Sequence, residues 1–349
     1  MDIMTEGTLS KIADRIEMQN ALLAAIAEAK PGSIKIDSFK AVQELVQTGL
    51  APKIFAIGDQ FTSNWTDVVS QKTYEFVWDI VDMGDVTLED GSVVPGMTLE
   101  MHYLTPFTIQ YDHEENQKAT EETFMEGISY YTKNSDGSYA LQEVVPGEQI
   151  PTDTTYYHSA IKDPTGNICR WGYNRWGHSA LRQWLNSNAG KGEWWTPQHV
   201  GDVAPNEVNG RDGFLTGLDE DFLNVLKKVK IRTQLNMVTD SNIGTDEETC
   251  DLFFLASKEQ VYGNRENGIY NDDTWGYYKK ATGLSSPNNN NNTGRIKYKL
   301  EARTQADWRR LRSPYRGNSY STWYVTAAGY VYNFSASPAS RLAPACVIA

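Results

Sequence analysis

The chain has 349 residues, of which 40% are hydrophobic, so it can bury a substantial core and global disorder is excluded. Its formal net charge of −13 argues against general nucleic-acid binding, and no apolar run approaches the ~18–20 residues that span a bilayer, so we expect neither a nucleic-acid partner nor membrane insertion. Three widely separated cysteines argue against a disulfide framework and against a structural zinc site.

Residues 8–29 show the periodicity of a helix with a heptad seam. Steps of three and four connect Leu9, Ile12, Ile16, Gln19, Leu23 and Ile26. This seam predicts a homotrimeric stalk. An ordinary amphipathic helix lying on a domain is the alternative, because about three heptads make a short coiled coil. A second helix is expected over 38–48, so residues 1–50 are predicted to be an N-terminal helical oligomerisation and attachment region.

From residue 53 onward the composition favours β-structure. The segments KIFAI, YEFVWDIV and TLEMHYL are rich in β-branched and aromatic residues. Asp90-Gly91 and Asp136-Gly137 are turn dipeptides that predict two hairpins. Residues 113–155 are predicted to be an insertion that leaves the main sheet.

The second half of the chain mixes helical and strand patterns. We expect two main helices, near 179–187 and 218–229, and a short buried strand at 252–257. The tail from Trp308 again alternates as a sheet does. Because strands and helices do not alternate regularly as βαβ units, the predicted fold class is α+β, with a twisted antiparallel sheet over 53–349.

Motifs for catalysis and metal binding are weak. No two of the five histidines stand at i, i+4, and the sequence contains no GxSxG, P-loop or GxGxxG. The set Asp240, Asn242, Asp246 and Asp251 resembles a calcium loop, but Thr245 stands where that loop needs glycine, so we interpret it as a polar surface loop. We therefore expect no catalytic residue, no metal and no cofactor, although a hydrolase with two distant carboxylates stays open.

The C-terminal segment differs chemically from the rest of the chain. From Gly294 onward nine Lys and Arg residues and two acidic ones give a net charge of +7, which leaves −20 for the first 293 residues. From Tyr315 to Ala349 there is no acidic residue, and seven residues are aromatic. A segment in which Tyr and Trp stand among Ser, Gly and Asn has the composition of a paratope, where rigid rings provide the contact area.

A period of two organises this segment. Tyr320, Thr322, Tyr324 and Thr326 would share one face of a strand, and Tyr330, Tyr332 and Phe334 one face of the next. We expect these residues to be exposed and Trp323, Val325 and Val331 to be buried; a two-sided core sheet is the alternative. The predicted ligand-binding residues are Tyr315, Arg316, Asn318, Tyr320, Thr322, Tyr324, Thr326, Tyr330, Tyr332, Phe334, Ser335, Ser337 and Ser340.

The tail resembles the C-terminal variable region of proteins that are diversified by retroelements in phages and bacteria. The fixed frame of that region would include Trp308, the LRSP segment, Trp323 and the ending LAPAC, with about 308–349 as the variable region. Over about 53–349 the motifs GYNRWGHSALRQWLN and LFFLASKEQVYG resemble a domain of gut bacteria and their phages. That domain is similar to the C-type-lectin and formylglycine-generating-enzyme group. Arg309-Arg310 departs from the apolar or aromatic residues expected before LRSP.

The resemblance implies a C-type-lectin-like domain that binds ligands and is not an enzyme. We expect a phage tail receptor-binding protein in the virion, with a host-surface protein or glycan as ligand and other virion proteins as partners. The start of the chain has no basic stretch followed by an apolar one, which fits a virion component released by lysis. The alternatives are a bacterial cell-surface adhesin, an enzyme related to the formylglycine-generating enzyme, whose chemistry needs two neighbouring cysteines, and a structural virion protein without a ligand.

Overall fold

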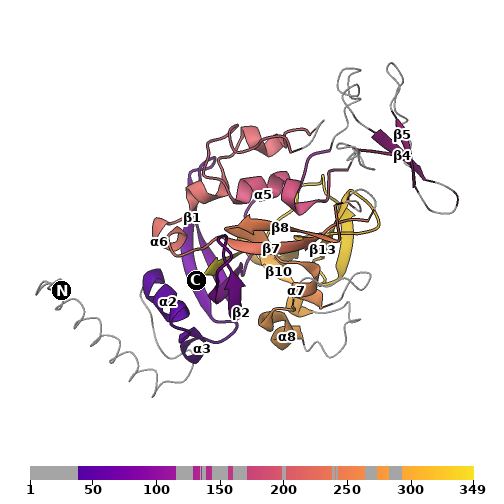
Figure 1. Ribbon diagram of the computed structural model, residues 1–349. Helices are drawn as coiled ribbons and strands as arrows, with labels where there is room; N and C mark the ends of the chain where they lie inside the picture. The colour runs from indigo at the N-terminus through magenta and orange to yellow at the C-terminus, as the bar shows by residue number, and fades with distance from the viewer. Residues whose placement is uncertain are drawn as a thin grey trace, which may run out of the picture.

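The computed structural model describes residues 38–114, 129–133, 135, 139–143, 156–159, 171–198, 202–237, 240, 243–263, 273–282 and 293–349. These residues form short helices and antiparallel sheets, with more sheet than helix (Figure 1). This mixture confirms the predicted combination of helices with antiparallel strands. No helix in these ranges is long and apolar enough to cross a membrane.

The bounds of the elements follow the chain in order. The helices are α2 (Phe39–Gln47), α3 (Ala51–Ile54), α5 (Ala180–Leu185), α6 (Glu220–Leu223), α7 (Lys258–Tyr262) and α8 (Gly276–Thr282). The strands are β1 (Gln60–Asp67), β2 (Lys72–Thr87), β3 (Val93–Met101), β4 (Ser129–Lys133), β5 (Tyr139–Glu143), β6 (Tyr156–Ser159), β7 (Val229–Gln234), β8 (Asp246–Asp251), β9 (Phe253–Leu255), β10 (Lys297–Lys299), β11 (Ala302–Asp307), β12 (Arg309–Pro314), β13 (Ser321–Val325), β14 (Val331–Ser335) and β15 (Pro344–Ile348).

The largest sheet places the C-terminal strand in its interior. Its order is β1-β2-β3-β15-β9, and Cys346 of β15 lies opposite Leu99 on one side and Phe253 on the other. The β2–β3 hairpin turns at the predicted Asp90-Gly91, where Gly91 has φ +87°. The two ends of the described chain therefore contribute to one sheet and one core.

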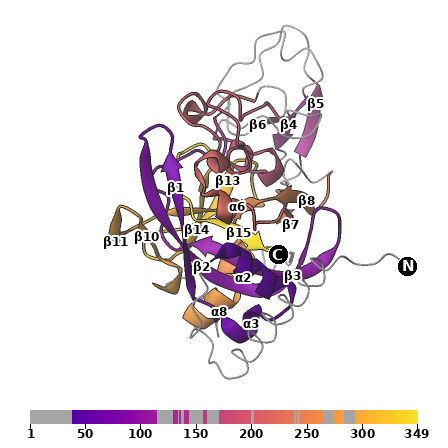
Figure 2. The same cartoon turned by 90° about the vertical axis from the view of Figure 1, so that its left-hand side faces the viewer.

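The helix expected over 38–48 is present as α2, capped by the Ser38 hydroxyl. It does not belong to a separate attachment region, because Val42, Leu45 and Val46 are part of the core. Gln43 Nε2 also donates to the carbonyl oxygen of the last residue, Ala349, at 2.9 Å, and both views show the C-terminus beside α2 (Figures 1 and 2). The predicted boundary at 50–53 is corrected to include α2 in the domain. The predicted helix over 8–29 lies outside the described residues, so the trimeric stalk stays a prediction.

The two expected main helices differ in outcome. α5 confirms the first, with Ser179 as N-cap and Leu181, Trp184 and Leu185 buried. The helix over 218–229 is wrong in extent, because only α6 is α-helical and β7 begins at Val229. Lys227 N donates to Val347 O at 3.0 Å, so the chain leaves the helix to reach β15. Leu226 and Val229 are still buried, Leu226 between α6 and β7 and Val229 as the first residue of β7.

The predicted insertion carries a sheet of its own. β4 pairs with β5 in the expected hairpin and with β6, and this sheet shares no strand with the others. Figure 1 shows β4 and β5 standing away from the central sheet. The insertion therefore continues past 155 to at least Ser159, while Asp136-Gly137 itself lies outside the described residues.

Candidate ligand-binding face

The C-terminal tail forms a three-stranded sheet in the order β12-β13-β14. Its register places Arg310 opposite Tyr324 and Tyr324 opposite Tyr332, and Thr322 lies opposite Phe334. Because directly opposed residues of antiparallel strands point to the same side, the even-numbered residues share one face, as the period of two predicts. We call this side the even face.

Four aromatic side chains are exposed on the even face, and we call them the aromatic patch: Trp308, Tyr330, Tyr332 and Phe334. Their exposed fractions are 42%, 43%, 60% and 48%. The ring centroids of Trp308 and Phe334 lie 6.5 Å apart, so the patch is continuous between the start of β12 and β14. Trp308 was assigned to the invariant frame in the sequence analysis. Its exposure on this face was therefore not predicted; the signal that could have found it is its position two residues before Arg310, which lies opposite Tyr324.

Two even-face residues that we expected to be exposed are buried. Tyr324 is 2% exposed and Thr322 is fully buried. Arg310 of the neighbouring strand covers both: its NH1 donates to Thr322 Oγ1 at 2.6 Å, and its Cζ lies 4.2 Å from the Tyr324 ring centroid. Burial raises the pKa of the Tyr324 phenol, which Arg310 and a hydrogen bond with Ser340 partly oppose. Tyr324 is therefore the floor of the patch and not part of its surface.

Arg310 is a buried cation that pairs with no carboxylate of the described residues. Besides Thr322, it donates from NH1 to Ser335 O at 3.1 Å, from NH2 to Pro338 O at 2.8 Å and from Nε to Ser340 Oγ at 3.2 Å. Burial lowers the pKa of this guanidinium, and the nearby phenols of Tyr324 and Tyr111 oppose that shift only in part. The guanidinium thus joins β13 to the segment 335–340 beneath the patch.

The other predicted ligand-binding residues lie at three levels of exposure. Arg316, Ser337 and Ser340 are buried and act in the framework; Arg316 NH1, for example, donates to Thr245 O at 3.0 Å. The partly exposed ones are Tyr315, Asn318, Tyr320, Thr326 and Ser335. Only Tyr330, Tyr332 and Phe334 are as exposed as predicted.

The opposite, odd face of the sheet matches the prediction only in part. Val325 and Val331 are buried as expected. Trp323, in the middle of the central strand, is only partly buried; Lys258 Nζ lies 3.6 Å from its ring centroid, and Tyr315 makes an edge contact with it. The expected contrast between a buried Trp323 and an exposed Tyr324 is therefore wrong at both positions.

Asn174 of the GYNRWGHS motif holds the loop that precedes β13. Its Nδ2 lies within hydrogen-bond distance of three carbonyl oxygens, those of Asn318 at 2.8 Å, Ser321 at 2.9 Å and Tyr315 at 3.3 Å. Its Oδ1 accepts from Asn236 Nδ2 at 3.0 Å. This buried amide gives the motif a structural task, because it fixes the backbone of 315–321 from below.

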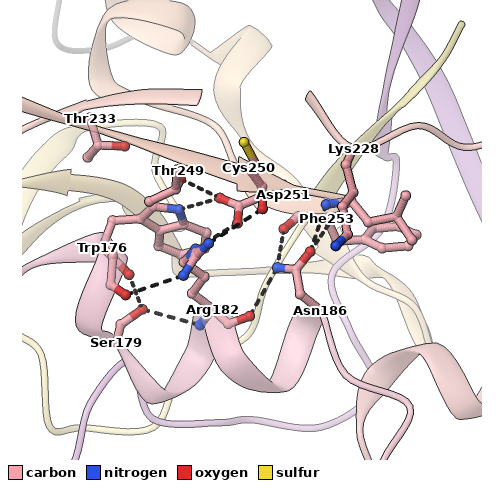
Figure 3. Close-up of polar contacts among 12 residues, drawn as sticks. Trp176, Ser179, Arg182, Asn186, Lys228, Thr233, Thr249, Cys250, Asp251 and Phe253 are labelled. Atoms are coloured by element: carbon pink, nitrogen blue, oxygen red, sulfur yellow. Dashed lines mark hydrogen bonds and ion pairs between the residues drawn. The ribbon is translucent and has the colours of Figure 1, made fainter. Parts of the chain in front are cut away.

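The rest of the motif joins α5 to β8 and β9 (Figure 3). Arg182 Nε donates to Asp251 Oδ1 at 2.6 Å, and Trp176 Nε1 donates to Asp251 Oδ2 at 2.9 Å. Asn186 acts as a substitute strand: its Nδ2 donates to Phe253 O at 2.8 Å and its Oδ1 accepts from Leu252 N at 2.7 Å and Phe253 N at 3.1 Å. These contacts cover the free edge of β9.

The excess positive charge of the C-terminal segment is largely internal. Arg309 NH1 donates to the buried Glu100 at 2.6 Å, and Lys297 Nζ lies 3.1 Å from the same carboxylate. Glu100 belongs to β3 in the acidic first part of the chain, so the two halves neutralise each other inside the fold. Burial disfavours the charged Arg309, but Glu100 outweighs this and raises the pKa of the guanidinium.

Metal and redox chemistry find little support in the described ranges. No group of three or more His, Cys, Asp and Glu side chains is placed there to hold a metal ion. The stretch from Asp240 to Asp251 is only in part the surface loop that we expected: residues 243–245 are exposed, but β8 begins at Asp246. Its two end residues are buried and hydrogen bonded, Asp240 to Tyr173 and Asp251 to Arg182. Cys346 is buried in β15, which raises the pKa of its thiol, and Cys169 lies outside the described residues.

The geometry defines a mixed helix and sheet domain whose C-terminal sheet presents an aromatic patch on a hydrogen-bonded framework. Residues 160–349, just over half of the chain, match the family described as "Domain of unknown function (DUF6273)". The chain belongs to this family. No curated protein and no solved structure matches it. The matched region contains Asn174, Arg182, Asp251 and Arg310, but β1, β2 and β3 of the central sheet precede it.

Proposed function

We propose that the protein is a non-enzymatic ligand-binding protein whose C-terminal sheet contacts the ligand through the aromatic patch. One observation carries the proposal: large rings are exposed on β14 and just before β12 and β14, above a floor of buried hydrogen bonds. Exposed aromatic side chains cost little conformational entropy on binding and are frequent hot spots. The buried floor of Arg310, Thr322 and Tyr324 supports a patch whose surface residues can change without loss of the fold.

The finer assignment extends the sequence resemblance. We propose a C-type-lectin-like domain with a retroelement-diversified variable region, in a phage tail receptor-binding protein of the virion. Its ligand would be a host-surface protein or glycan, and its oligomer a trimer formed through 8–29. The separation between exposed rings and buried framework supports this assignment, since diversification needs positions that tolerate exchange. A bacterial cell-surface adhesin is the alternative with the same binding face.

The alternative of an enzyme related to the formylglycine-generating enzyme would require two cysteines side by side. Cys346 and Cys250 are free, and Cys346 is fully buried in the central sheet with a raised thiol pKa, which disfavours the reactive thiolate. The described residues thus offer less for this chemistry than the patch offers for binding.

Sequencing many copies of this locus with its flanking DNA tests the proposal. We expect variable codons at Tyr330, Tyr332 and Phe334, and invariant codons at Arg310, Asn174 and Arg182. A nearby reverse transcriptase gene and an imperfect repeat that differs at adenines should accompany them. Variation spread evenly over framework and patch, or no variation in the tail, would contradict the proposal.

A further inference from the structure

β14 has an edge that no other described strand covers, since it pairs only with β13. Two bonds fix which backbone groups face β13: Thr326 N donates to Tyr330 O at 2.8 Å, and Ala336 N donates to Tyr320 O at 2.7 Å. Even-numbered residues therefore direct their N–H and C=O toward β13. The alternation of an antiparallel ladder turns the same groups of Val331, Asn333 and Ser335 outward.

The outward groups of β14 are largely unused. Ser335 O accepts from Arg310, but the N–H and C=O groups of Val331 and Asn333 have no hydrogen-bond partner among the described residues. Two other sheet edges are covered: β12 by a bridge from Arg309 to Arg341, and β9 by Asn186. Val331 and Asn333, two residues apart, therefore offer two N–H and two C=O groups with the spacing of a β-ladder.

The side chains of the β13–β14 hairpin do not protect this edge. Natural proteins block exposed edges with charges, prolines or bulges, yet residues 317–337 contain no charged residue and no proline. Tyr332 and Phe334 stand beside the edge on the even face and are exposed. A strand added here would place alternate side chains next to these rings, with no charge opposite it.

We propose that the β14 edge binds an extended, uncharged segment of a partner protein by strand addition, as a further strand of the β12-β13-β14 sheet. The inference rests on the proposed ligand-binding function and specifies the ligand as a polypeptide. Aromatic rings alone suit a sugar as well as an apolar side chain. Alternating N–H and C=O groups at strand spacing match a polypeptide backbone, and the absence of charge matches an uncharged segment.

The probe for the test is a linear ten-residue peptide, enriched from a random peptide library on the purified full chain. Its affinity is then measured for two variants. Asn333→Pro removes one outward N–H that the β13 ladder does not use, whereas Asn333→Ala keeps it. We expect Asn333→Pro to weaken binding by roughly tenfold or more and Asn333→Ala to leave it nearly unchanged. Equal unfolding midpoints of the two variants control for folding.

A second measurement needs no protein variant. Each amide of the probe peptide is N-methylated in turn. Strand addition predicts that methylation weakens binding at every second residue, because alternate amides point to β14. Equal binding to Asn333→Pro and Asn333→Ala, a methylation profile without period two, or failure to enrich any such peptide would each overturn the proposal.

The outcomes also separate this inference from the proposed function. If the protein binds a glycan array and Tyr332→Ala abolishes this binding while Asn333→Pro leaves it unchanged, the patch binds sugars and strand addition is wrong. If codons vary at the patch but the methylation profile lacks period two, the ligand-binding function stands and only the edge inference fails. If peptide binding depends on the β14 edge but the codons of the aromatic patch do not vary, strand addition stands and diversification of the patch is refuted.

Discussion

Arg309 and Arg310 are consecutive residues of β12 whose side chains anchor opposite sides of the sheet. Arg309 reaches the buried Glu100 at 2.6 Å, and Arg310 reaches Thr322 Oγ1 at 2.6 Å beneath the aromatic patch. This pair explains why two arginines stand where apolar residues were expected. Arg309 joins the sheet to the central core, and Arg310 holds the residues beneath the aromatic patch.

Replacing Arg310 by Met should destabilise the protein while keeping the length of the side chain. Thr322 Oγ1 and Ser340 Oγ would lose their buried donor, and a buried acceptor without a partner costs about 1–3 kcal/mol. Relief of the unpaired buried charge reduces the loss. Urea unfolding measures the difference. Arg303→Met, at an exposed arginine, is the control and should change stability by less than about 0.5 kcal/mol. Equal stability of both variants would show that Arg310 is dispensable.

Tyr324→Ala and Tyr332→Ala should separate clearly in stability, although the two residues face each other across β13 and β14. Tyr324 is buried against Arg310, so its loss should cost about 3–5 kcal/mol, as for other buried aromatics. Tyr332 is mostly exposed, and its loss should stay within about 0.5 kcal/mol. Chemical unfolding of both variants checks this. Similar losses would mean that the floor and the surface of the face are not distinct.

Asn174→Ala should loosen the loop 315–321 specifically. The change removes the amide that contacts three loop carbonyl oxygens, and we expect a loss of about 1–3 kcal/mol. Hydrogen exchange should accelerate at the loop amides, including that of Tyr315, which donates to Ser321 O. Asn188→Ala, at an exposed asparagine, is the matched control. Unchanged exchange in the loop of Asn174→Ala would refute the proposed task of this motif.

Stability in acid should depend on Asp79. Burial raises the pKa of this carboxyl, but the hydrogen bond with His102 and the charge of Lys297 outweigh it, so the folded pKa lies below the ordinary value of 3.8. Because its pKa is lower in the folded than in the unfolded protein, the Asp79 carboxylate stabilises the fold at pH values above the unfolded pKa. This stabilisation is lost as the pH falls through the folded pKa. The stability difference between the native chain and Asp79→Asn should therefore shrink below about pH 4. A difference that does not change with pH would contradict this.

The family-matched fragment 160–349 should not fold by itself. Without β3, one side of β15 would lose its partner, and α2 would be missing from the core. A fragment of residues 38–349 retains both and should unfold cooperatively. Thermal unfolding of the two fragments, followed by circular dichroism, compares them. Cooperative unfolding of 160–349 would show that the matched region is an independent domain.

Local pattern alone determined several features of this protein. Period two in the tail correctly predicted the strands around 321–325 and 331–335 and which residues share a face. Asp90-Gly91 predicted its hairpin, and Ser179 with its apolar face predicted α5. These features depend on neighbours within a few residues, so the sequence contains the information that specifies them.

Tertiary contacts decided what the pattern left open. Tyr324 and Tyr332 look alike in the sequence, but Arg310 and the 335–340 segment cover only Tyr324. Residues 224–229 have helical spacing, yet hydrogen bonding to β15 draws the chain out of the helix. The sequence pattern placed α2 in a stalk, but in the structure its apolar face packs in the core. In each case the deciding partner is distant in sequence, and hydrogen bonding and burial with such a partner outweigh local preference.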